Sequence, residues 1–365
     1  MSWIPLILIL PYIILLLKCY RGLVHLEVFK ISVEPSTFVS IIVACHNEEK
    51  NLPPLLNCLT LQNYPGLLFE VIIIDDNSTD RTFDIAKEFT GINNIQTFNN
   101  IGTGKKAALL TGINSAKGPL IITTDADCIM GAEWIRTIAA FYELHKPELI
   151  ICPVQIKSVK GFAGNFQALE FLSLQGTTAG FASEKEPVMC NGANLAFPLD
   201  TYLNHSVSLH EELNSGDDIF LLHSLKKVNS SKILWLESSE AIVTTESVSS
   251  FRLFIKQRSR WISKSPSYKD KFTITLGVVT FVTIILQILY FAWFIIDPSI
   301  IWNLVLFLVL KSIPDYLILR NTTKRYGNRN LMRWFIPVQL VYPLYVLIVT
   351  LYSMINPQSK IRIPK

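Results

Sequence analysis

Residues Ile121 to Met130 have the sequence IITTDADCIM. An apolar pair leads through two threonines to two carboxylates one residue apart, Asp125 and Asp127. This pattern predicts a buried strand that ends in a polar loop, and open α/β sheets bind ligands beyond the carboxyl ends of their strands. Paired acids there offer oxygen ligands to a hard divalent cation, which in turn holds a diphosphate. Taken alone, D-x-D is more often a solvated turn, so the rest of the chain must decide.

The composition of the 365-residue chain indicates a globular unit joined to membrane segments. Half of the residues (50%) are hydrophobic and only 17% are charged, which is unusual for a soluble protein. The net charge of +4 gives no reason to expect nucleic-acid binding. Basic residues cluster beside apolar runs, as expected of a chain that faces anionic lipid. The six cysteines include no C-x-x-C pair, which predicts free thiols in a reducing compartment.

Short apolar strands alternate with helical stretches in the first half of the chain. The expected strands are residues 39–44, 70–74, 95–98, 120–123 and 149–154, and the expected helices are residues 51–61, 82–89, 107–116 and 134–144. Strand–helix alternation with polar clusters at the strand ends predicts a largely parallel, doubly wound α/β sheet.

The N-terminal segment, residues 1–21, is expected to be an uncleaved membrane anchor. Its positive charges, Lys18 and Arg21, follow the apolar run, whereas those of a secretory signal peptide precede it. By the positive-inside rule, this flank places the following domain in the cytoplasm.

Apolar segments at residues 272–296, 300–319 and 336–355 predict two to three C-terminal spans. Lys311 and Asp315 lie four residues apart in the second of them, where they can pair on one helical face. The following loop is rich in arginine and lysine, which indicates the cytoplasmic side. The exit of the last segment would place a basic tail outside, so either the tail is tolerated there or the segment does not fully cross.

Four motifs occur in a fixed order: DDNSTD at 75–80, DAD at 125–127, GDD at 216–218 and QRSRW at 257–261. This order resembles membrane-integrated family 2 glycosyltransferases, which include cellulose, hyaluronan and poly-N-acetylglucosamine synthases and ceramide glucosyltransferases. The resemblance covers roughly residues 38 to 265. It implies a GT-A, Rossmann-like nucleotide-sugar-binding fold with this organisation: anchor 1–21, cytoplasmic catalytic domain 38–250, amphipathic interfacial segment 251–268, transmembrane helices 272–355 and tail 356–365.

The resemblance assigns the donor nucleotide sugar to charged residues near the strand ends, namely Glu48, Asp75, Asp76, Lys105, Asp125 and Asp127. The base and ribose are expected beside Asp75 and Asp76, and whichever of these two points away is expected to cap a turn. Asp127 is expected to coordinate Mg²⁺ or Mn²⁺, with Asp125 toward the nucleotide sugar.

The acceptor side of the resemblance rests on the last two motifs and on Asn194. Asp218 is implied as the general base and Asp217 as a supporting acid, although an acid at the start of a helix also serves as a cap. The resemblance places the acceptor sugar on Trp261 and the leaving diphosphate beside Gln257 and Arg260. The planar fork of arginine suits a diphosphate. Membrane-interface anchoring is the competing role for Trp261.

The resemblance implies an inverting hexosyltransferase that uses a UDP-sugar donor at the cytoplasmic face of the cell membrane. The acceptor is expected to be a polysaccharide or a membrane lipid, and a homodimer or partner subunit is expected if a polymer is to be threaded through a channel. The alternatives are a strictly glycolipid-forming transferase and a catalytically silent membrane scaffold of the same fold. The donor sugar and the linkage depend on the shape of the pocket, which no short motif encodes.

Overall fold

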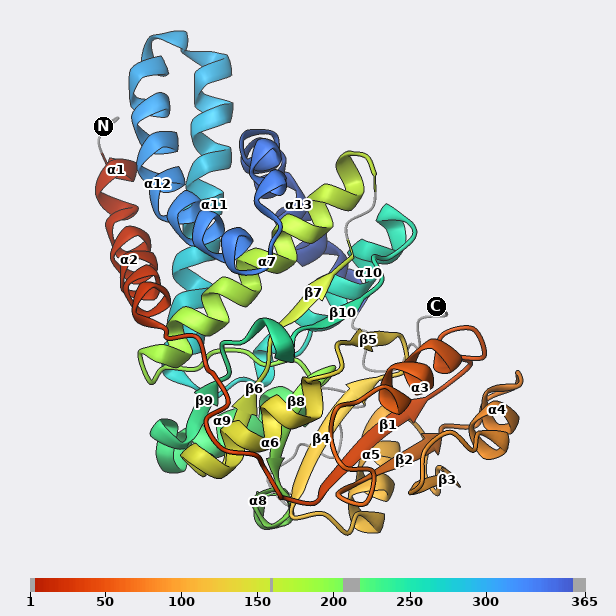
Figure 1. The fold of residues 1–365 in the computed structure, drawn as a ribbon. Coiled ribbons are helices and arrows are strands. Elements are labelled where there is room, and N and C mark those ends of the chain that lie inside the picture. The colour runs from red at the N-terminus through yellow and green to blue at the C-terminus, as the bar shows by residue number, and fades with distance from the viewer. Residues whose placement is uncertain (1–3, 158–159, 206–216, 357–365) are drawn as a thin grey trace. The chain divides into compact units, whose positions relative to one another are not determined.

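The computed structural model describes residues 4–157, 160–205 and 217–356, and the chain divides into two compact units (Figure 1). Segments Glu27–Lys157 and Met189–Glu246 form one of them, which we call the α/β unit. Segments Met1–Leu26, Ser158–Val188 and Ser247–Lys365 form the other, the helical unit.

A seven-stranded sheet with the order β3-β2-β1-β4-β8-β6-β9 forms the centre of the α/β unit. Its strands are β1 (Val39–Cys45), β2 (Phe69–Asp75), β3 (Ile95–Asn99), β4 (Leu120–Asp125), β6 (Leu149–Ile151), β8 (Asn194–Pro198) and β9 (Ile233–Trp235). The prediction of an α/β sheet is confirmed. The exception to parallel pairing is β8, which runs antiparallel to both β4 and β6.

A second, three-stranded sheet has the order β5-β10-β7, with β5 at Cys128–Met130, β7 at Val154–Ile156 and β10 at Val243–Thr245. The single strand expected at residues 149–154 is therefore two strands, because the chain leaves the large sheet after Ile151 and enters the small one at Val154. Pro153 lies between them, and proline cannot donate to a sheet ladder.

Helices cover both faces of the large sheet. Helices α3 (Leu52–Thr60) and α6 (Trp134–His145) share a buried core with Ile41 and Val43 of β1. Helix α5 (Lys105–Ser115) packs on the other face, where a Cβ on Gly112 would lie 2.6 Å from Ile42 Cγ2. This alternation along β1 is the doubly wound arrangement that the sequence predicts. The unit also contains α4 (Thr82–Glu88), α8 (Leu199–His205) and α9 (Asp217–Asn229).

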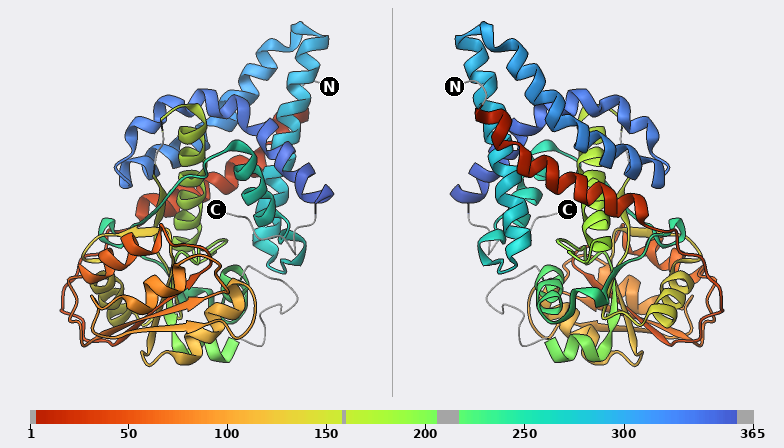
Figure 2. Two further views of the ribbon diagram at one scale, coloured as in Figure 1. Left: turned by 90° about the vertical axis from the view of Figure 1, so that its right-hand side faces the viewer. Right: turned by 90° about the vertical axis from the view of Figure 1, so that its left-hand side faces the viewer.

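The helical unit comprises α1 (Ile4–Leu8), α2 (Leu10–His25), α7 (Phe162–Ser183), α10 (Phe251–Ile262), α11 (Lys271–Ile296), α12 (Ile301–Arg325) and α13 (Phe335–Ile355). Figure 2 shows α11 and α12 as an antiparallel hairpin joined by a short turn. By length and composition, four helical segments within the described ranges can cross a membrane: Ile4–His25, Lys271–Ile296, Pro298–Arg325 and Arg329–Ile355. The prediction of one N-terminal and up to three C-terminal membrane helices is confirmed at this level.

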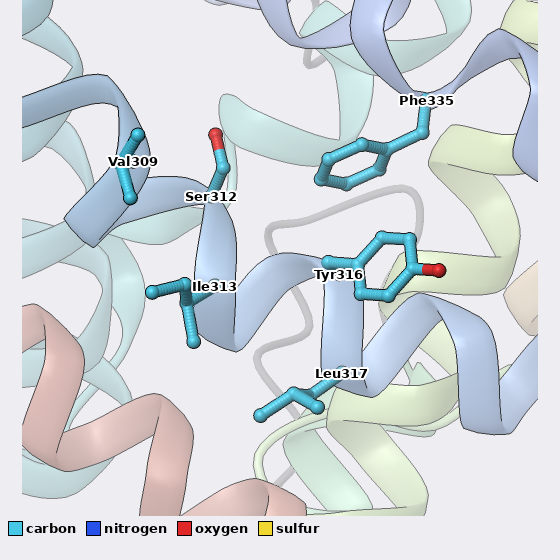
Figure 3. Close-up of a pocket in the computed structure, with 6 residues that line it drawn as sticks. All are labelled: Val309, Ser312, Ile313, Tyr316, Leu317 and Phe335. Carbon is cyan, nitrogen blue, oxygen red and sulfur yellow. The ribbon is translucent and has the colours of Figure 1, made fainter. Parts of the chain in front are cut away.

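An open groove of about 270 Å³ lies along α12 and the start of α13. Figure 3 shows the six side chains that line it: Val309, Ser312, Ile313, Tyr316, Leu317 and Phe335. Because its walls are almost wholly apolar and belong to candidate spans, lipid acyl chains would cover it in a bilayer. It contains none of the site residues expected from the sequence.

Candidate functional site

The carboxyl ends of three neighbouring strands meet at one edge of the large sheet. In the strand register, Asp75 of β2 lies opposite Cys45 of β1, and Asp125 of β4 lies opposite Ala44 on the other side of β1. Neighbouring strands are about 4.8 Å apart, so the backbones at Asp75 and Asp125 are separated by roughly 10 Å. The sheet therefore brings two of the expected donor-binding carboxylates to the same edge.

Asp75 is buried, with 3% of its surface exposed, and its carboxylate is only half satisfied. Its Oδ2 accepts the backbone N–H of Ser78 at 3.0 Å. Its Oδ1 accepts no hydrogen bond from any residue in the described part of the chain. A buried acceptor without a donor costs about 1–3 kcal/mol. A ligand N–H, such as that of a nucleobase, would remove this cost.

Asp76 and Glu48 are occupied by local contacts of the protein. Asp76 Oδ1 accepts hydrogen bonds from Asn100 Nδ2 at 2.8 Å and from the backbone N–H of Gly104 at 2.9 Å. Gly104 has φ = 90°, a conformation that favours glycine. Glu48 Oε2 accepts from Asn51 Nδ2 at 2.6 Å. Asp76 therefore fixes the loop that precedes α5, and Glu48 stabilises the start of α3.

Lys105, the first residue of α5, forms an ion pair with Asp125 Oδ1. The side chains of Lys105 and Asp125 are 43% and 29% exposed, respectively. Pairs this accessible to solvent contribute little to stability, about 0–1 kcal/mol. Both charges are therefore accessible to a ligand from solvent.

Asp127 lies in the turn between β4 and β5, where Thr245 Oγ1 donates a hydrogen bond to its Oδ2 at 3.2 Å. Burial, together with the charges of Asp125 and Asp127, raises the pKa of the neighbouring Cys128 thiol. Cys128 is therefore a neutral thiol.

The carboxylates of Asp125 and Asp127 fit a cation that takes the rest of its coordination shell from substrate and water. Within residues 4–157, 160–205 and 217–356, no cluster of three or more His, Cys, Asp or Glu side chains is arranged to hold a metal. Mg²⁺ commonly takes one or two protein carboxylates and fills its remaining positions with substrate phosphate and water. Asp125 and Asp127 match this donor set.

Asp218 is connected to β4 through the backbone of Gly192. The Gly192 N–H donates to Asp218 Oδ2 at 3.1 Å, and the Gly192 carbonyl accepts the Thr123 hydroxyl at 2.8 Å. Thr123 precedes Asp125 by two residues on the same strand. The N–H of Ile219 donates to Asp218 Oδ1 at 2.9 Å. The structure thus ties the GDD carboxylate to the strand that carries D-x-D.

Asn194 is fully buried in the core of the α/β unit. Its Nδ2 donates to the carbonyls of Pro153 and Ala241 at 2.7 and 2.8 Å, and its Oδ1 accepts Trp134 Nε1 at 3.0 Å. These contacts engage both the nitrogen and the oxygen of the amide. Asn194 therefore links β8 to neighbouring segments, and its side chain is not available to bind an acceptor substrate. Of Asp217, the structure describes the backbone at the start of α9, and Gly216 of the motif is outside the described residues.

Gln257, Arg260 and Trp261 all lie on α10 of the helical unit. Ser250 caps this helix by accepting the N–H of Leu253 at 3.3 Å. Gln257 Oε1 accepts Arg258 Nη1 at 2.6 Å, and the Arg258 guanidinium lies 4.1 Å from the centre of the Trp261 ring.

The sequence analysis missed Arg258 and its partner Glu170 on α7, which form a buried ion pair. The available signal was Glu170, a single acid in the otherwise uncharged helix FAGNFQALEFLSLQGTTAGFAS. A charge that is buried in an apolar helix almost always has a partner.

Two family models match the chain. The model described as "Glycosyl transferase family 2" matches residues 40–197, and the one described as "Glycosyl transferase family group 2" matches residues 120–352, which is more than half of the chain.

Two curated relatives resemble part of the chain. The poly(ribitol-phosphate) beta-N-acetylglucosaminyltransferase TarS of Staphylococcus aureus is 31% identical over 126 residues, which are 33% of this chain and 21% of TarS. The undecaprenyl-phosphate 4-deoxy-4-formamido-L-arabinose transferase of Pseudomonas aeruginosa is 37% identical over 101 residues, which are 26% of this chain and 29% of that enzyme. The matched segments thus span less than a third of either relative.

A solved structure shares the fold along nearly the whole chain. The mannosyltransferase PcManGT of Pyrobaculum calidifontis, in complex with GDP-Man and Mn²⁺, aligns with a TM-score of 0.59 at 16% identity. The alignment covers 98% of this chain and 99% of that one. From the family match, the α/β sheet and the four apolar helices, the chain belongs to glycosyltransferase family 2, as a membrane-associated member with the GT-A fold.

Proposed function

We propose that the chain transfers a hexose from a UDP-sugar to a polysaccharide or membrane-lipid acceptor, with inversion at the anomeric carbon. The observation that carries this proposal is the carboxylate edge of the α/β unit, where Asp75 ends β2 and Asp125 ends β4 on either side of β1. Asp127 follows β4, and Asp218 accepts a hydrogen bond from the Gly192 backbone, which is itself bonded to Thr123 of β4. Ligands of open α/β sheets bind at such an edge.

In this proposal the donor nucleotide is held by groups of the α/β unit. The unsatisfied Oδ1 of Asp75 accepts an N–H of the base, and Lys105 exchanges Asp125 for a phosphate oxygen. Asp125 and Asp127 would hold a divalent cation, Mg²⁺ or Mn²⁺, which neutralises the charge that develops on the leaving diphosphate. The Mn²⁺ in the complex of PcManGT supports the use of such an ion.

The transfer step needs a group that takes a proton from the acceptor hydroxyl. Asp218 is proposed as this base, because its carboxylate is fixed by the N–H groups of Gly192 and Ile219. The hydroxyl oxygen forms a bond to the anomeric carbon as its proton passes to Asp218. The bond from that carbon to the diphosphate oxygen breaks, and UDP leaves with the electron pair. Asp217 is proposed to orient the acceptor.

The helical unit is proposed to serve the acceptor and the leaving group. Trp261 offers an aromatic face for a sugar, and Gln257 and Arg260 offer donors for a diphosphate. The relatives are named for both a polymer acceptor and an undecaprenyl-phosphate acceptor, which supports either class. Secretion of a polymer would need further spans from a second copy or a partner subunit.

The positive flanks of the spans support a catalytic side that faces the cytoplasm, with the chain crossing the cell membrane several times. The α/β unit would then take its nucleotide sugar from the cytoplasmic pool.

Asp218→Asn tests the proposed mechanism. Removal of a general base is expected to lower the transfer rate by about 10²–10⁴-fold. Donor affinity, measured by calorimetry with UDP, is expected to stay within about twofold, because the base is not a donor ligand. Asp200→Asn, an exposed acid of the same unit, is the matched control and is expected to keep wild-type turnover. Full turnover by Asp218→Asn would contradict the role of Asp218 as base.

A further inference from the structure

The second residue of the QRSRW motif of α10, Arg258, forms a buried ion pair with Glu170 of α7. Arg258 and Glu170 are 3% and 5% exposed, respectively. Arg258 Nη2 donates to Glu170 Oε2 at 2.7 Å, and Arg258 Nε lies 3.0 and 3.2 Å from the two carboxylate oxygens. The guanidinium thus makes a bidentate interaction with the carboxylate through two nitrogens, a geometry that lysine cannot reproduce.

The Arg258 guanidinium is held in its charged form. Burial by itself would lower the pKa of Arg258, but the adjacent carboxylate of Glu170 outweighs burial and raises the pKa of the guanidinium. Tyr345 of α13 donates its hydroxyl to Glu170 Oε1 at 3.1 Å. One polar network therefore joins α7, α10 and α13 inside an apolar cluster that includes Phe254 and Leu169.

Arg258 also contacts two other residues of the motif directly. Its Nη1 donates to Gln257 Oε1 at 2.6 Å, which engages the amide oxygen and leaves the amide's N–H donors for an anionic ligand. Its guanidinium covers one face of the Trp261 indole at 4.1 Å from the ring centre. The same guanidinium also lies 4.7 Å from the centre of the Phe254 ring. The orientations of Gln257 and Trp261 are thus set by a group whose own position Glu170 and Tyr345 fix.

We infer that Arg258, Glu170 and Tyr345 are positioning residues for sugar transfer, which hold Trp261 and Gln257 in the orientation that receives the acceptor and the leaving diphosphate. This inference rests on the proposed function. A positioning role has a different consequence from a purely structural one. Disturbing the network is expected to change the kinetic constants for the acceptor, while the part of the donor site around Asp75 is untouched.

Arg258→Lys keeps the charge but loses the bidentate grip and the planar cover of Trp261. We expect kcat/KM for the acceptor to fall about tenfold, a change in activation free energy of about 1.4 kcal/mol, with a higher KM for the acceptor. The KM for the UDP-sugar is expected to change less than that for the acceptor, because the Asp75 end of the donor site is untouched. Arg252→Lys, an exposed arginine of the same helix, is the matched control and is expected to match wild type.

Tyr345→Phe provides the test if Arg258→Lys does not fold, since it removes one hydroxyl and keeps the ring. We expect a smaller loss in the same parameter, about threefold for one buried hydrogen bond. The inference is overturned if both kinetic constants of the acceptor are unchanged in folded variants. It is equally overturned if only the amount of active protein falls, with both KM values unaltered.

A spectroscopic readout separates this inference from the proposed function. The fluorescence emission of Trp261 is obtained by subtracting the spectrum of a Trp261→Phe protein from that of the same protein with Trp261 intact. This difference spectrum is measured once in the Arg258→Lys variant and once in the Arg252→Lys variant. We expect a shift of this difference spectrum in the Arg258→Lys background alone. If the wild type transfers no sugar, the proposed function has failed, and an unshifted Trp261 spectrum would overturn the positioning role independently.

Discussion

Asp75 and Asp76 are adjacent in the chain, but their carboxylates differ in how many hydrogen bonds they accept. Asp76 is engaged by Asn100 and Gly104, whereas Oδ1 of Asp75 accepts nothing from the described residues. The sequence predicted that one of the two would face the ligand, but it did not identify which. That choice depends on where the loop of residues 100–104 lies, a tertiary fact without a local signature.

Asp75→Asn is predicted to weaken nucleotide binding without weakening the fold. The substitution removes a buried carboxylate that is only half satisfied, so the free energy of unfolding is expected not to fall. The dissociation constant for UDP is expected to rise at least tenfold, about 1.4 kcal/mol, because the base loses its charged acceptor. Calorimetry and thermal unfolding measure the two quantities.

Asp84→Asn is the control for this prediction, since Asp84 is an exposed acid of the neighbouring helix α4. It is expected to change neither quantity. A variant Asp75→Asn that binds UDP as wild type does, or that unfolds at a much lower temperature, would show that Asp75 is a structural carboxylate.

Local features also decide which of the other site residues could be predicted. The sequence placed Asp125, Asp127 and Lys105 near the edge of the sheet, because motif order and strand ends are local features. It did not foresee that the amide of Asn194 is consumed by Trp134, Pro153 and Ala241, since these partners come from three distant segments.

Among the elements, α7 lies close to its neighbours at glycines. A Cβ on Gly180 would lie 2.4 Å from the carbonyl oxygen of Cys19 in α2, and a Cβ on Gly176 would lie 2.1 Å from Thr322 Oγ1 in α12. Small residues allow apolar helices to approach closely, which is a common packing device in membranes. The sequence analysis did not use these glycines.

Gly180→Ala is predicted to destabilise the protein, although alanine is ordinarily the better helix former by about 1 kcal/mol. The added methyl group would meet backbone, which cannot move aside as a flexible side chain does. We expect a net loss of about 1–3 kcal/mol, measured by thermal unfolding in detergent. Gly277→Ala in α11 is the matched control, because a Cβ there meets nothing within 4 Å, and it is expected to be neutral or stabilising. Equal effects of the two substitutions would refute the close approach.

Helix α12 carries a charged pair inside a candidate span. Lys311 Nζ lies 2.8 Å from Asp315 Oδ2 and 2.7 Å from Gln339 Oε1, and the Tyr12 hydroxyl donates to Asp315 Oδ1 at 2.5 Å. The predicted pairing of Lys311 with Asp315 is confirmed, while Tyr12 and Gln339 are additional partners from α2 and α13. Their contribution was not visible in the sequence because they lie 303 and 24 residues from Asp315.

Replacement of one member of this pair is predicted to cost more than replacement of both. Asp315→Leu leaves the Lys311 charge buried and is expected to lower the free energy of unfolding by about 3–5 kcal/mol. The double variant with Lys311→Met removes both charges and is expected to recover most of that loss. Lys324→Met, an exposed lysine of the same helix, is expected to be neutral. A double variant less stable than Asp315→Leu would contradict this account.

At the scale of the whole molecule, periodicity and motif order were sufficient for the fold class, the four apolar helices and the family. The strand pattern did not reveal β8, which runs antiparallel to β4 and β6, or the break between β6 and β7. Both features depend on pairing between segments more than 40 residues apart in the chain, as in the pairing of Ile150 with Ala196 and of Val154 with Val243. The grouping of α7 with the apolar helices likewise follows from packing.

We predict that this chain moves a sugar from a UDP-sugar with the help of a divalent cation. The most direct test is UDP release by detergent-purified protein from a panel of UDP-sugars, with and without Mn²⁺, in the presence of native membrane lipid extract and a labelled donor. We predict Mn²⁺-dependent release from one donor, with the label recovered in a lipid product or in high-mass material. Release of no UDP from any donor by folded protein, or equal release after chelation of the metal, would contradict the account.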